Sequence, residues 1–555
     1  MKKNIFLLFC LFEVVLYAQT PSVLRGPYLQ NPTPSSIVIK WRTDTATNSR
    51  VSYGTSLNSL VSNVDSTGLT KEHTVKISNL APFTQYYYSI GTASKTLSGP
   101  SANHHFTTAP PSGTPRPVRV WAIGDFGKGI QQQADVRDAY LNYVGNEHTD
   151  VWLWLGDNAY DTGTDVEFQT KVFEDTFGYN KIFPYMPFMP CPGNHDYGSI
   201  SPPLGTINPQ KHTGAYFDII DVPTNGEAGG VPSKTELYYS FDYANIHFVS
   251  LNSELGSIVP SYDYIGAFDG DFENLPMVKW LRQDLAANTM DWTIVYWHQC
   301  PYSKGSHNSD DGFELYMKAM RDNFTPIVEE YGVDMVVCGH SHVYERSYLI
   351  KGHTGSSSNF NSANLINGST GNFDKGQEYY KYTKTSNPNQ GTVYVVCGNS
   401  ASKDDNAVLN HPVMAASDGC STCLGSFVLE IDNNRLDGKY LKVDGSIGDY
   451  FTIIKQDFPT EIKEMSSLVS EIKVIPNPFK NQAKIEYNLT QNHNLSIDLT
   501  DMSGRLIQNL FHGHNTEGKH TIDLDTESLK MSKGTYFLIF QYGNQVYHKQ
   551  IVTLE

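Results

Sequence analysis

The chain has 555 residues, which is too long for one compact core, so several domains are expected. Hydrophobic residues make up 39% of the sequence and aromatic residues 12%, a composition that excludes disorder throughout the chain. The formal net charge is -17, and Lys and Arg form no dense cluster. This balance argues against a protein that binds nucleic acid by neutralising its phosphates.

Residues 1–18 begin with two lysines, continue as an apolar stretch and end at Ala18, which predicts a secretory signal peptide cleaved after Ala18. A membrane anchor is the alternative, but the stretch is shorter than the ~20 residues that span a bilayer. Export permits disulfides, and Cys420 and Cys423 could close a small loop or act in redox exchange. The other cysteines after the signal peptide follow apolar runs and are expected to be buried: Cys191, Cys300, Cys338 and Cys397.

Residues 21–108 alternate apolar and polar residues in short runs separated by Pro, Ser, Asn and Gly, a pattern typical of an all-β sandwich. Residues 80–88, LAPFTQYYY, resemble the tyrosine-corner segment of fibronectin type III domains, and Trp41 is the expected core tryptophan. Residues 109–117 are rich in proline and predict a linker.

From Val118 onward, apolar strands alternate with helical stretches, which predicts two β-sheets flanked by helices. Two long loops, 197–235 and 352–391, are expected to interrupt this pattern. A compositional break near residues 456–475 precedes a further set of short strands. The predicted fold is therefore multidomain, with a central α/β sandwich between N-terminal and C-terminal all-β sandwich domains.

Five predicted strands of the central region end in a Gly or an aromatic residue followed by side chains that can bind metals. The segments are VWAIGDFG with Asp125, VWLWLGDNAY with Asp157 and Tyr160, FMPCPGNHD with Asn194 and His195, IVYWHQC with His298, and VVCGHSH with His340 and His342. Because the carboxyl ends of strands in layered α/β folds meet at one edge, we expect these side chains to converge. Glycines before the ligands would let the backbone approach an ion closely.

The ligand types indicate which metals the site would bind. Carboxylate, phenolate, carboxamide and imidazole groups without thiolate favour an Fe, Zn or Mn ion, and they argue against a structural zinc site with cysteine ligands. Two ions sharing a carboxylate can hold both the attacking and the leaving oxygen of a displacement reaction. They also supply positive charge that the acidic chain lacks.

The segments GDFG, GDNAY, GNHD, WHQC and GHSHVYERS resemble, in order and approximate spacing, the five motifs of purple acid phosphatases, which are calcineurin-like metallophosphoesterases. The resemblance covers residues 115–455, and residues 21–108 are similar to the N-terminal domain of that family. Tyr160 in GDNAY marks the purple subgroup.

The resemblance implies a role for each matching residue. A ferric ion would be bound by Asp125, Asp157, Tyr160 and His342, and a divalent Zn, Fe or Mn ion by the bridging Asp157 with Asn194, His298 and His340. Asn194, His195 and His307 would contact the substrate, with His195 and His307 as the catalytic histidines. The family's paired histidines are incomplete here because position 308 is Asn, and Asp196 is expected to orient His195.

The implied reaction is hydrolysis of a phosphate monoester by a metal-bound hydroxide, with no phosphoenzyme. Phosphodiester or nucleotide hydrolysis is the alternative at the same site, and a surface adhesion protein with an inactive central domain is the alternative of another class. Glu345 and Arg346 are expected to form a buried pair that fixes the last motif, and Trp297 to belong to the core.

Residues 467–555 resemble the sorting domain of type IX secretion, with IPNPF near their start, DMSGRLI in the middle and a late Lys549. This resemblance implies contact with the type IX machinery and a secreted or cell-surface location. A carbohydrate- or protein-binding β-module is the alternative.

Overall fold

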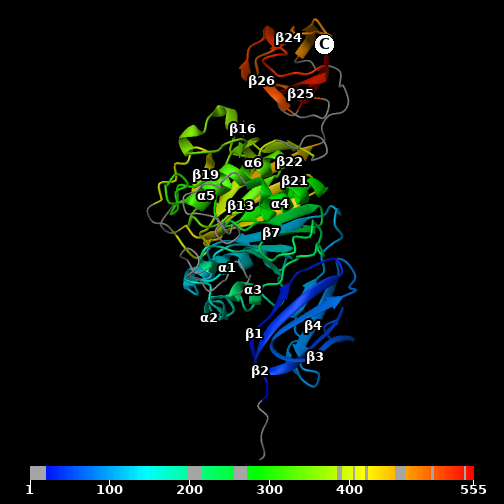
Figure 1. Cartoon of the computed structure of the whole chain (residues 1–555), viewed down its shortest axis with the longest axis vertical. Coiled ribbons are helices and arrows are strands. Elements are labelled where there is room, and N and C mark those ends of the chain that lie inside the picture. Colours follow the sequence, from blue (N-terminus) through cyan, green and yellow to red (C-terminus); the bar gives the residue numbers. More distant parts are fainter. Residues whose placement is uncertain are drawn as a thin grey trace, which may run out of the picture.

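The computed structural model describes residues 20–197, 214–254, 272–383, 390–403, 407–418, 423–456, 469–501, 506–542 and 545–554. Three units follow one another along the long axis of the molecule: a β-domain in blue, a central mixed domain, and a β-domain in orange and red (Figure 1). Each unit has its own cluster of buried apolar side chains. The predicted fold class is confirmed, and the expected signal peptide lies outside the described residues.

The N-terminal domain is built around one long strand, β2, which pairs with β1, β3 and β4. Its core contains Trp41, and the hydroxyl of Tyr86 accepts a hydrogen bond from the Ala81 nitrogen at 3.0 Å, as expected of a tyrosine corner. The Tyr88 hydroxyl donates to the Pro184 carbonyl at 2.8 Å, so the domain is joined to the central domain by a buried hydrogen bond. Its strands are β1 (Val23–Gln30), β2 (Ser36–Gly54), β3 (Ser62–Ser78), β4 (Gln85–Gly91), β5 (Thr96–Ser98) and β6 (His105–Thr107).

The central domain contains two seven-stranded sheets, ordered β17-β22-β21-β20-β7-β8-β9 and β10-β11-β12-β13-β18-β14-β19. The first comprises β7 (Val118–Ile123), β8 (Val151–Leu155), β9 (Phe188–Cys191), β17 (Tyr379–Tyr382), β20 (Gly425–Asp432), β21 (Arg435–Lys442) and β22 (Ile447–Gln456). The second comprises β10 (Tyr239–Tyr243), β11 (Ile246–Ser250), β12 (Trp292–Trp297), β13 (Met335–Cys338), β14 (Tyr344–Ser347), β18 (Val393–Cys397) and β19 (Met414–Asp418). Strands β7, β8 and β9 pair in parallel, as do β12 and β13.

Helices cover the sheets, as the alternating sequence pattern predicts. Helix α1 (Gln131–Val144) lies against β20 and β21 of the first sheet. Helix α4 (Pro276–Ala287) starts with a proline in its first turn, and its Asp284 accepts hydrogen bonds from Ser240 and His247 of the second sheet. The other α-helices are short: α2 (Asp165–Glu167), α3 (Ala215–Ile219), α5 (Leu315–Ala319) and α6 (Thr325–Glu330). Among the described residues, no helix has the length and apolar character needed to cross a bilayer.

The expectation of a long loop over residues 352–391 is wrong, because two strands lie within this range. Strand β16 (Leu365–Asn367) pairs with β15 (Leu349–Ile350), and β17 extends the first sheet beside β22. The inward side chain Lys381 is buried and forms a 2.9 Å ion pair with Asp334, so this strand lacks the apolar alternation that a sequence reading detects. The other expected loop, 197–235, contains α3 and lies partly outside the described residues.

The C-terminal domain packs a three-stranded sheet against a four-stranded sheet around its own apolar core. The strands are β23 (Val469–Ile475), β24 (Gln482–Leu489), β25 (His493–Asp501), β26 (Leu506–Asn515), β27 (Gly518–Asp525), β28 (Gly534–Tyr542) and β29 (Gln545–Thr553). In the central domain, the four cysteines expected to be buried are buried and free: Cys191, Cys300, Cys338 and Cys397. Cys423 is disulfide-bonded, whereas Cys420 lies outside the described residues.

Candidate metal centre

The seven predicted metal ligands lie together at the carboxyl ends of five strands. Strands β7, β8 and β9 of the first sheet precede Asp125, Asp157, Tyr160 and Asn194, and strands β12 and β13 of the second precede His298, His340 and His342. Parallel pairing within each sheet places these strand ends on one edge. The site therefore lies where the two sheets meet, and both sheets contribute to it.

One group of donor atoms surrounds the phenol of Tyr160. Its hydroxyl lies 3.0 Å from Asp125 Oδ1, 3.0 Å from Asp157 Oδ2 and 3.5 Å from His342 Nε2. His342 Nε2 is also 3.6 Å from Asp125 Oδ1. These four side chains direct two carboxylate oxygens, a phenol and an imidazole nitrogen towards one another.

A second group surrounds the amide oxygen of Asn194. This oxygen lies 3.1 Å from His298 Nε2 and 3.1 Å from His340 Nδ1. His298 Nε2 lies 3.4 Å from Asp157 Oδ1. Asp157 therefore faces the first group with Oδ2 and the second group with Oδ1, and it is the residue common to both.

The donor set fits two cations. Asp125 and Asp157 are 0% and 2% exposed, and the ion-pair partners that the described part of the chain gives them are histidines. Burial opposes ionisation of Asp157, yet His298 and His195 hold its pKa below the ordinary value. Burial, together with the two carboxylates, raises the pKa of Tyr160 well above its ordinary value, so the phenolate form needs a cation beside it.

His298, in the second donor group, is oriented by a contact with the backbone. The Nδ1 atom of His298 lies 2.8 Å from the Leu155 carbonyl oxygen, which can only accept a hydrogen bond. The proton is therefore assigned to Nδ1, and the Nε2 lone pair is left for an ion.

Glycines permit the close packing around these donors. Gly156 has φ +89°, and a Cβ added there would lie 2.5 Å from His298 Nδ1. At Gly193 a Cβ would lie 2.3 Å from Asp157 Oδ1. Asp125, Asp157 and His340 themselves have φ of 58°, 53° and 71°, a backbone region that is costly for residues other than glycine. Strain of this kind concentrates at functional sites.

Comparison with known families agrees with this arrangement. Residues 118–344 match the family described as calcineurin-like phosphoesterase, and residues 27–108 match the purple acid phosphatase N-terminal domain. Residues 118–344 therefore form a calcineurin-like phosphoesterase domain, preceded by a purple acid phosphatase N-terminal domain. Residues 473–554 match the secretion system C-terminal sorting domain.

Individual relatives are distant. An uncharacterized protein of Mycobacterium tuberculosis is 27% identical over 358 residues, which is 58% of this chain and 61% of the relative. Purple acid phosphatase 15 of Arabidopsis thaliana is 29% identical over 298 residues, which is 50% of this chain and 49% of the relative. The chain thus spans about half to three-fifths of the length of these curated relatives. The structure of a purple acid phosphatase from yellow lupin seeds shares the fold, with TM-score 0.56, 19% identity, and coverage of 80% of this chain and 78% of that one.

His195 lies beside the first donor group. Its Nδ1 is 2.7 Å from the Asp161 carbonyl oxygen, its Nε2 is 3.8 Å from Asp157 Oδ2, and its side chain is 25% exposed. The expectation that Asp196 orients His195 is wrong. The buried Asp196 carboxylate instead accepts hydrogen bonds from the Gly193 nitrogen at 2.9 Å and from Asn158 Nδ2 at 2.8 Å, which joins the loops after β8 and β9.

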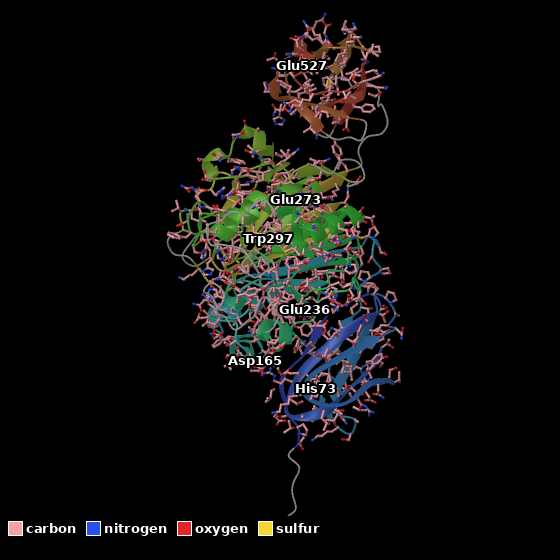
Figure 2. The ribbon with its side chains drawn as sticks, in the orientation of Figure 1. His73, Asp165, Glu236, Glu273, Trp297 and Glu527 are labelled. Carbon is pink, nitrogen blue, oxygen red and sulfur yellow. The ribbon has the colours of Figure 1, made fainter. Side chains whose placement is uncertain are left out.

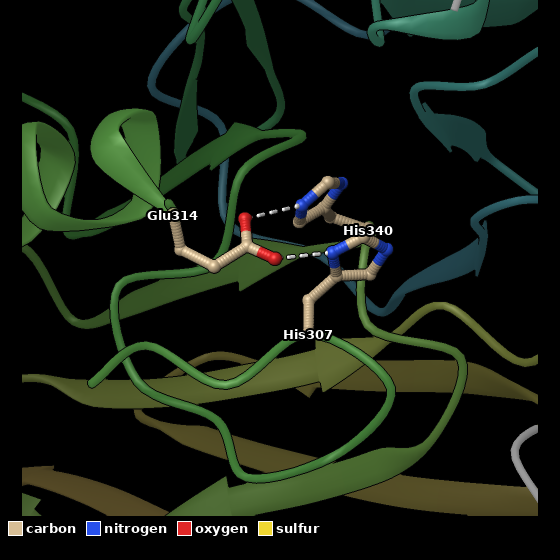
Figure 3. A group of neighbouring side chains, drawn as sticks. All are labelled: His307, Glu314 and His340. Atoms are coloured by element: carbon tan, nitrogen blue, oxygen red, sulfur yellow. Dashed lines mark hydrogen bonds and ion pairs between the residues drawn. The ribbon is translucent and has the colours of Figure 1, made fainter. Parts of the chain in front are cut away.

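His307 lies on the other side of the site, where its ring packs 3.8 Å from that of His340. Its Nδ1 is 2.6 Å from Oε1 of Glu314, a residue that sequence reasoning did not single out (Figure 3). Glu314 immediately precedes helix α5 and follows no strand, so the pattern that identified the other residues could not find it.

Glu345 and Arg346 are both buried, but they do not pair with each other. Neighbouring residues of a strand point to opposite faces, and β14 carries them to different partners. Arg346 Nε forms a 2.6 Å ion pair with Asp449, whereas Glu345 accepts a 2.5 Å hydrogen bond from Ser303 and so anchors the segment leading to His307. Trp297, labelled in Figure 2, is fully buried, which confirms it as a core residue.

Proposed function

We propose that this chain is a secreted dinuclear-metal phosphatase that hydrolyses phosphate monoesters. The observation that carries the proposal is the placement of Asp157, whose two carboxylate oxygens face two separate groups of donor atoms. A shared carboxylate between two such groups is the arrangement of two-metal hydrolytic sites. The relatives named purple acid phosphatase support the same reaction class.

The residues would divide between the two ions by chemistry. The group with the phenol suits Fe(III): Asp125, Asp157, Tyr160 and His342. The group with an amide and two imidazoles suits a divalent Zn, Fe or Mn ion: Asp157, Asn194, His298 and His340. When bound, the ions supply positive charge for the phosphate oxygens and make a water molecule sufficiently acidic to act as nucleophile.

Two histidines of the chain would act on the substrate itself. His195 and His307 have side chains 25% and 34% exposed, and each has its Nδ1 engaged, by the Asp161 carbonyl and by Glu314 respectively. Their Nε2 atoms are therefore the nitrogens available for the phosphate oxygens or for the oxygen of the departing alcohol. Asn194, whose amide oxygen lies within the second donor group, would contribute to substrate binding beside them.

The test is hydrolysis of an aryl phosphate monoester and the matching diester by protein of known metal content, from acid to neutral pH. Turnover with iron bound and the monoester preferred supports the proposal. Preference for the diester would favour a phosphodiesterase or nucleotide hydrolase. Absence of turnover in fully metal-loaded protein would favour an adhesion protein with an inactive central domain.

The proposed location is outside the cell or on its surface, through the type IX machinery. The match of residues 473–554 to a secretion sorting domain supports this route. The intact mass of the exported protein tests it, because a sorting domain is removed during export whereas a carbohydrate- or protein-binding module would be retained.

A further inference from the structure

Glu314 contacts two functional histidines at once. Its Oε1 lies 2.6 Å from His307 Nδ1 and its Oε2 lies 3.5 Å from His340 Nε2. Both contacts are drawn as dashed lines in Figure 3. The carboxylate side chain is 22% exposed, and the two rings that it contacts pack 3.8 Å apart. A single side chain thus joins a proposed metal ligand to a proposed substrate-binding residue.

The contact with His340 decides which of its nitrogens can bind an ion. Its Nδ1 lies 3.1 Å from Asn194 Oδ1 and 3.3 Å from His298 Nε2, so this nitrogen faces the second donor group. Its Nε2 faces the carboxylate. A neutral imidazole carries one proton, and both Asn194 Oδ1 beside Nδ1 and the Glu314 carboxylate beside Nε2 can only accept it. With Nδ1 given to an ion, the proton would lie on Nε2, where Glu314 accepts it and so stabilises the tautomer that binds the ion.

The contact with His307 has the same effect on the other ring. Glu314 accepts the proton of Nδ1, so the ring is held with Nε2 as the nitrogen that a substrate can reach. The backbone nitrogen of His307 also lies 3.4 Å from Ser341 Oγ, which ties this loop to the turn between His340 and His342. Position 308 is Asn, so the residue after His307 does not provide a second imidazole for contact with the substrate.

We propose that Glu314 is a positioning residue that sets the ring orientation and tautomer of both His307 and His340, and thereby couples substrate contact to occupancy of the divalent metal site. The kinetic part of this proposal rests on the proposed function. The metal-binding part does not, because the affinity for Zn²⁺ can be measured without turnover.

The test compares Glu314→Gln with Asp310→Asn in the full-length protein. Asp310 lies on the same loop, and its carboxylate contacts Ser357 and Lys304, so it is a matched control. We expect E314Q to weaken Zn²⁺ binding at the second site on the order of 10- to 100-fold in chelator competition, as loss of a carboxylate partner of a metal-bound histidine generally does. D310N should bind Zn²⁺ within about twofold of the unchanged protein.

The kinetic arm uses saturating Zn²⁺, so that the second site is full in every variant. E314Q and His307→Ala should each lower kcat/KM for an aryl phosphate, and the double variant should be no worse than H307A, because Glu314 then acts only through His307. Circular dichroism and thermal unfolding establish that each variant is folded. If E314Q does not fold, Glu314→Asp takes its place, since the shorter side chain withdraws the carboxylate from both rings.

Unchanged Zn²⁺ affinity in E314Q, or independent losses in the double variant, would overturn the proposal. The proposal would also be overturned if the unchanged protein bound three ions per chain and E314Q only two. His307, Glu314 and His340 would then form a metal site of their own. If the unchanged protein binds two ions but hydrolyses no ester, the proposed function fails, whereas the Zn²⁺ affinities still decide the role of Glu314.

Discussion

Replacing Gly193 by alanine would act directly on the carboxylate that the two donor groups share. The added Cβ would lie 2.3 Å from both the backbone nitrogen and Oδ1 of Asp157, whereas ordinary contacts lie at 3.4–4 Å. Gly193 does not have a positive φ, so the cost is steric and is not a backbone preference. Asp157 or its loop must move by about 1 Å, a displacement that can lower catalytic efficiency by ~100-fold.

The assay measures kcat/KM for an aryl phosphate together with the iron and zinc content of Gly193→Ala. Overpacking of this kind also costs about 1–3 kcal/mol of stability, so thermal unfolding is recorded in parallel. The matched control is Gly312→Ala, because a Cβ at Gly312 meets no atom within 4 Å. If Gly193→Ala keeps both ions and its activity stays within about threefold of that of Gly312→Ala, the steric reasoning is refuted.

Three further predictions concern single side chains. Asp157→Ala should abolish turnover and reduce the content of both ions, as measured by elemental analysis; retained activity would remove Asp157 from the shared position. Burial lowers the pKa of His247, but Asp242 and Asp284 raise it to about 9 from 6.5. Protonated His247 therefore contributes roughly 3 kcal/mol to the free energy of unfolding. This contribution is fully present below about pH 6.5 and is lost as the pH rises through about 9. His247→Gln should abolish this loss in calorimetry of the central domain, and an unchanged pH slope would contradict it. Arg346→Met should cost about 3–5 kcal/mol because Asp449 is left without its 2.6 Å partner, and Asp449→Asn in the same background should recover part of the loss.

The sequence is sufficient to predict where the donor atoms converge. An apolar run, a glycine and a metal-capable side chain are adjacent in the chain, as in VWLWLGD, which ends at Asp157, and parallel pairing carries such strand ends to one edge. The alternation of strands and helices likewise predicts the two covered sheets of the central domain. Local pattern and fold-level geometry agree at these positions.

Partners of polar side chains are harder to predict because they depend on distances across the folded molecule. Arg346 pairs with Asp449, which is 103 residues away, and not with its neighbour Glu345. The buried Lys381 makes β17 resemble a polar loop in sequence, although Asp334 neutralises it. Glu314 belongs to the same class, since a single acidic residue before a short helix has no periodicity or spacing that distinguishes it from a surface residue.

The division of the donor atoms between two sheets has a consequence for the durability of the molecule. Asp157 and Asn194 follow strands of one sheet, whereas His298 and His340 follow strands of the other. Each ion would therefore act as a non-covalent cross-link between the halves of the sandwich, and an ion at 1,000 times its Kd would add about 4 kcal/mol to the free energy of unfolding. The lifetime of the metal-loaded protein against heat and proteolysis would then depend on the trace-metal supply of its surroundings.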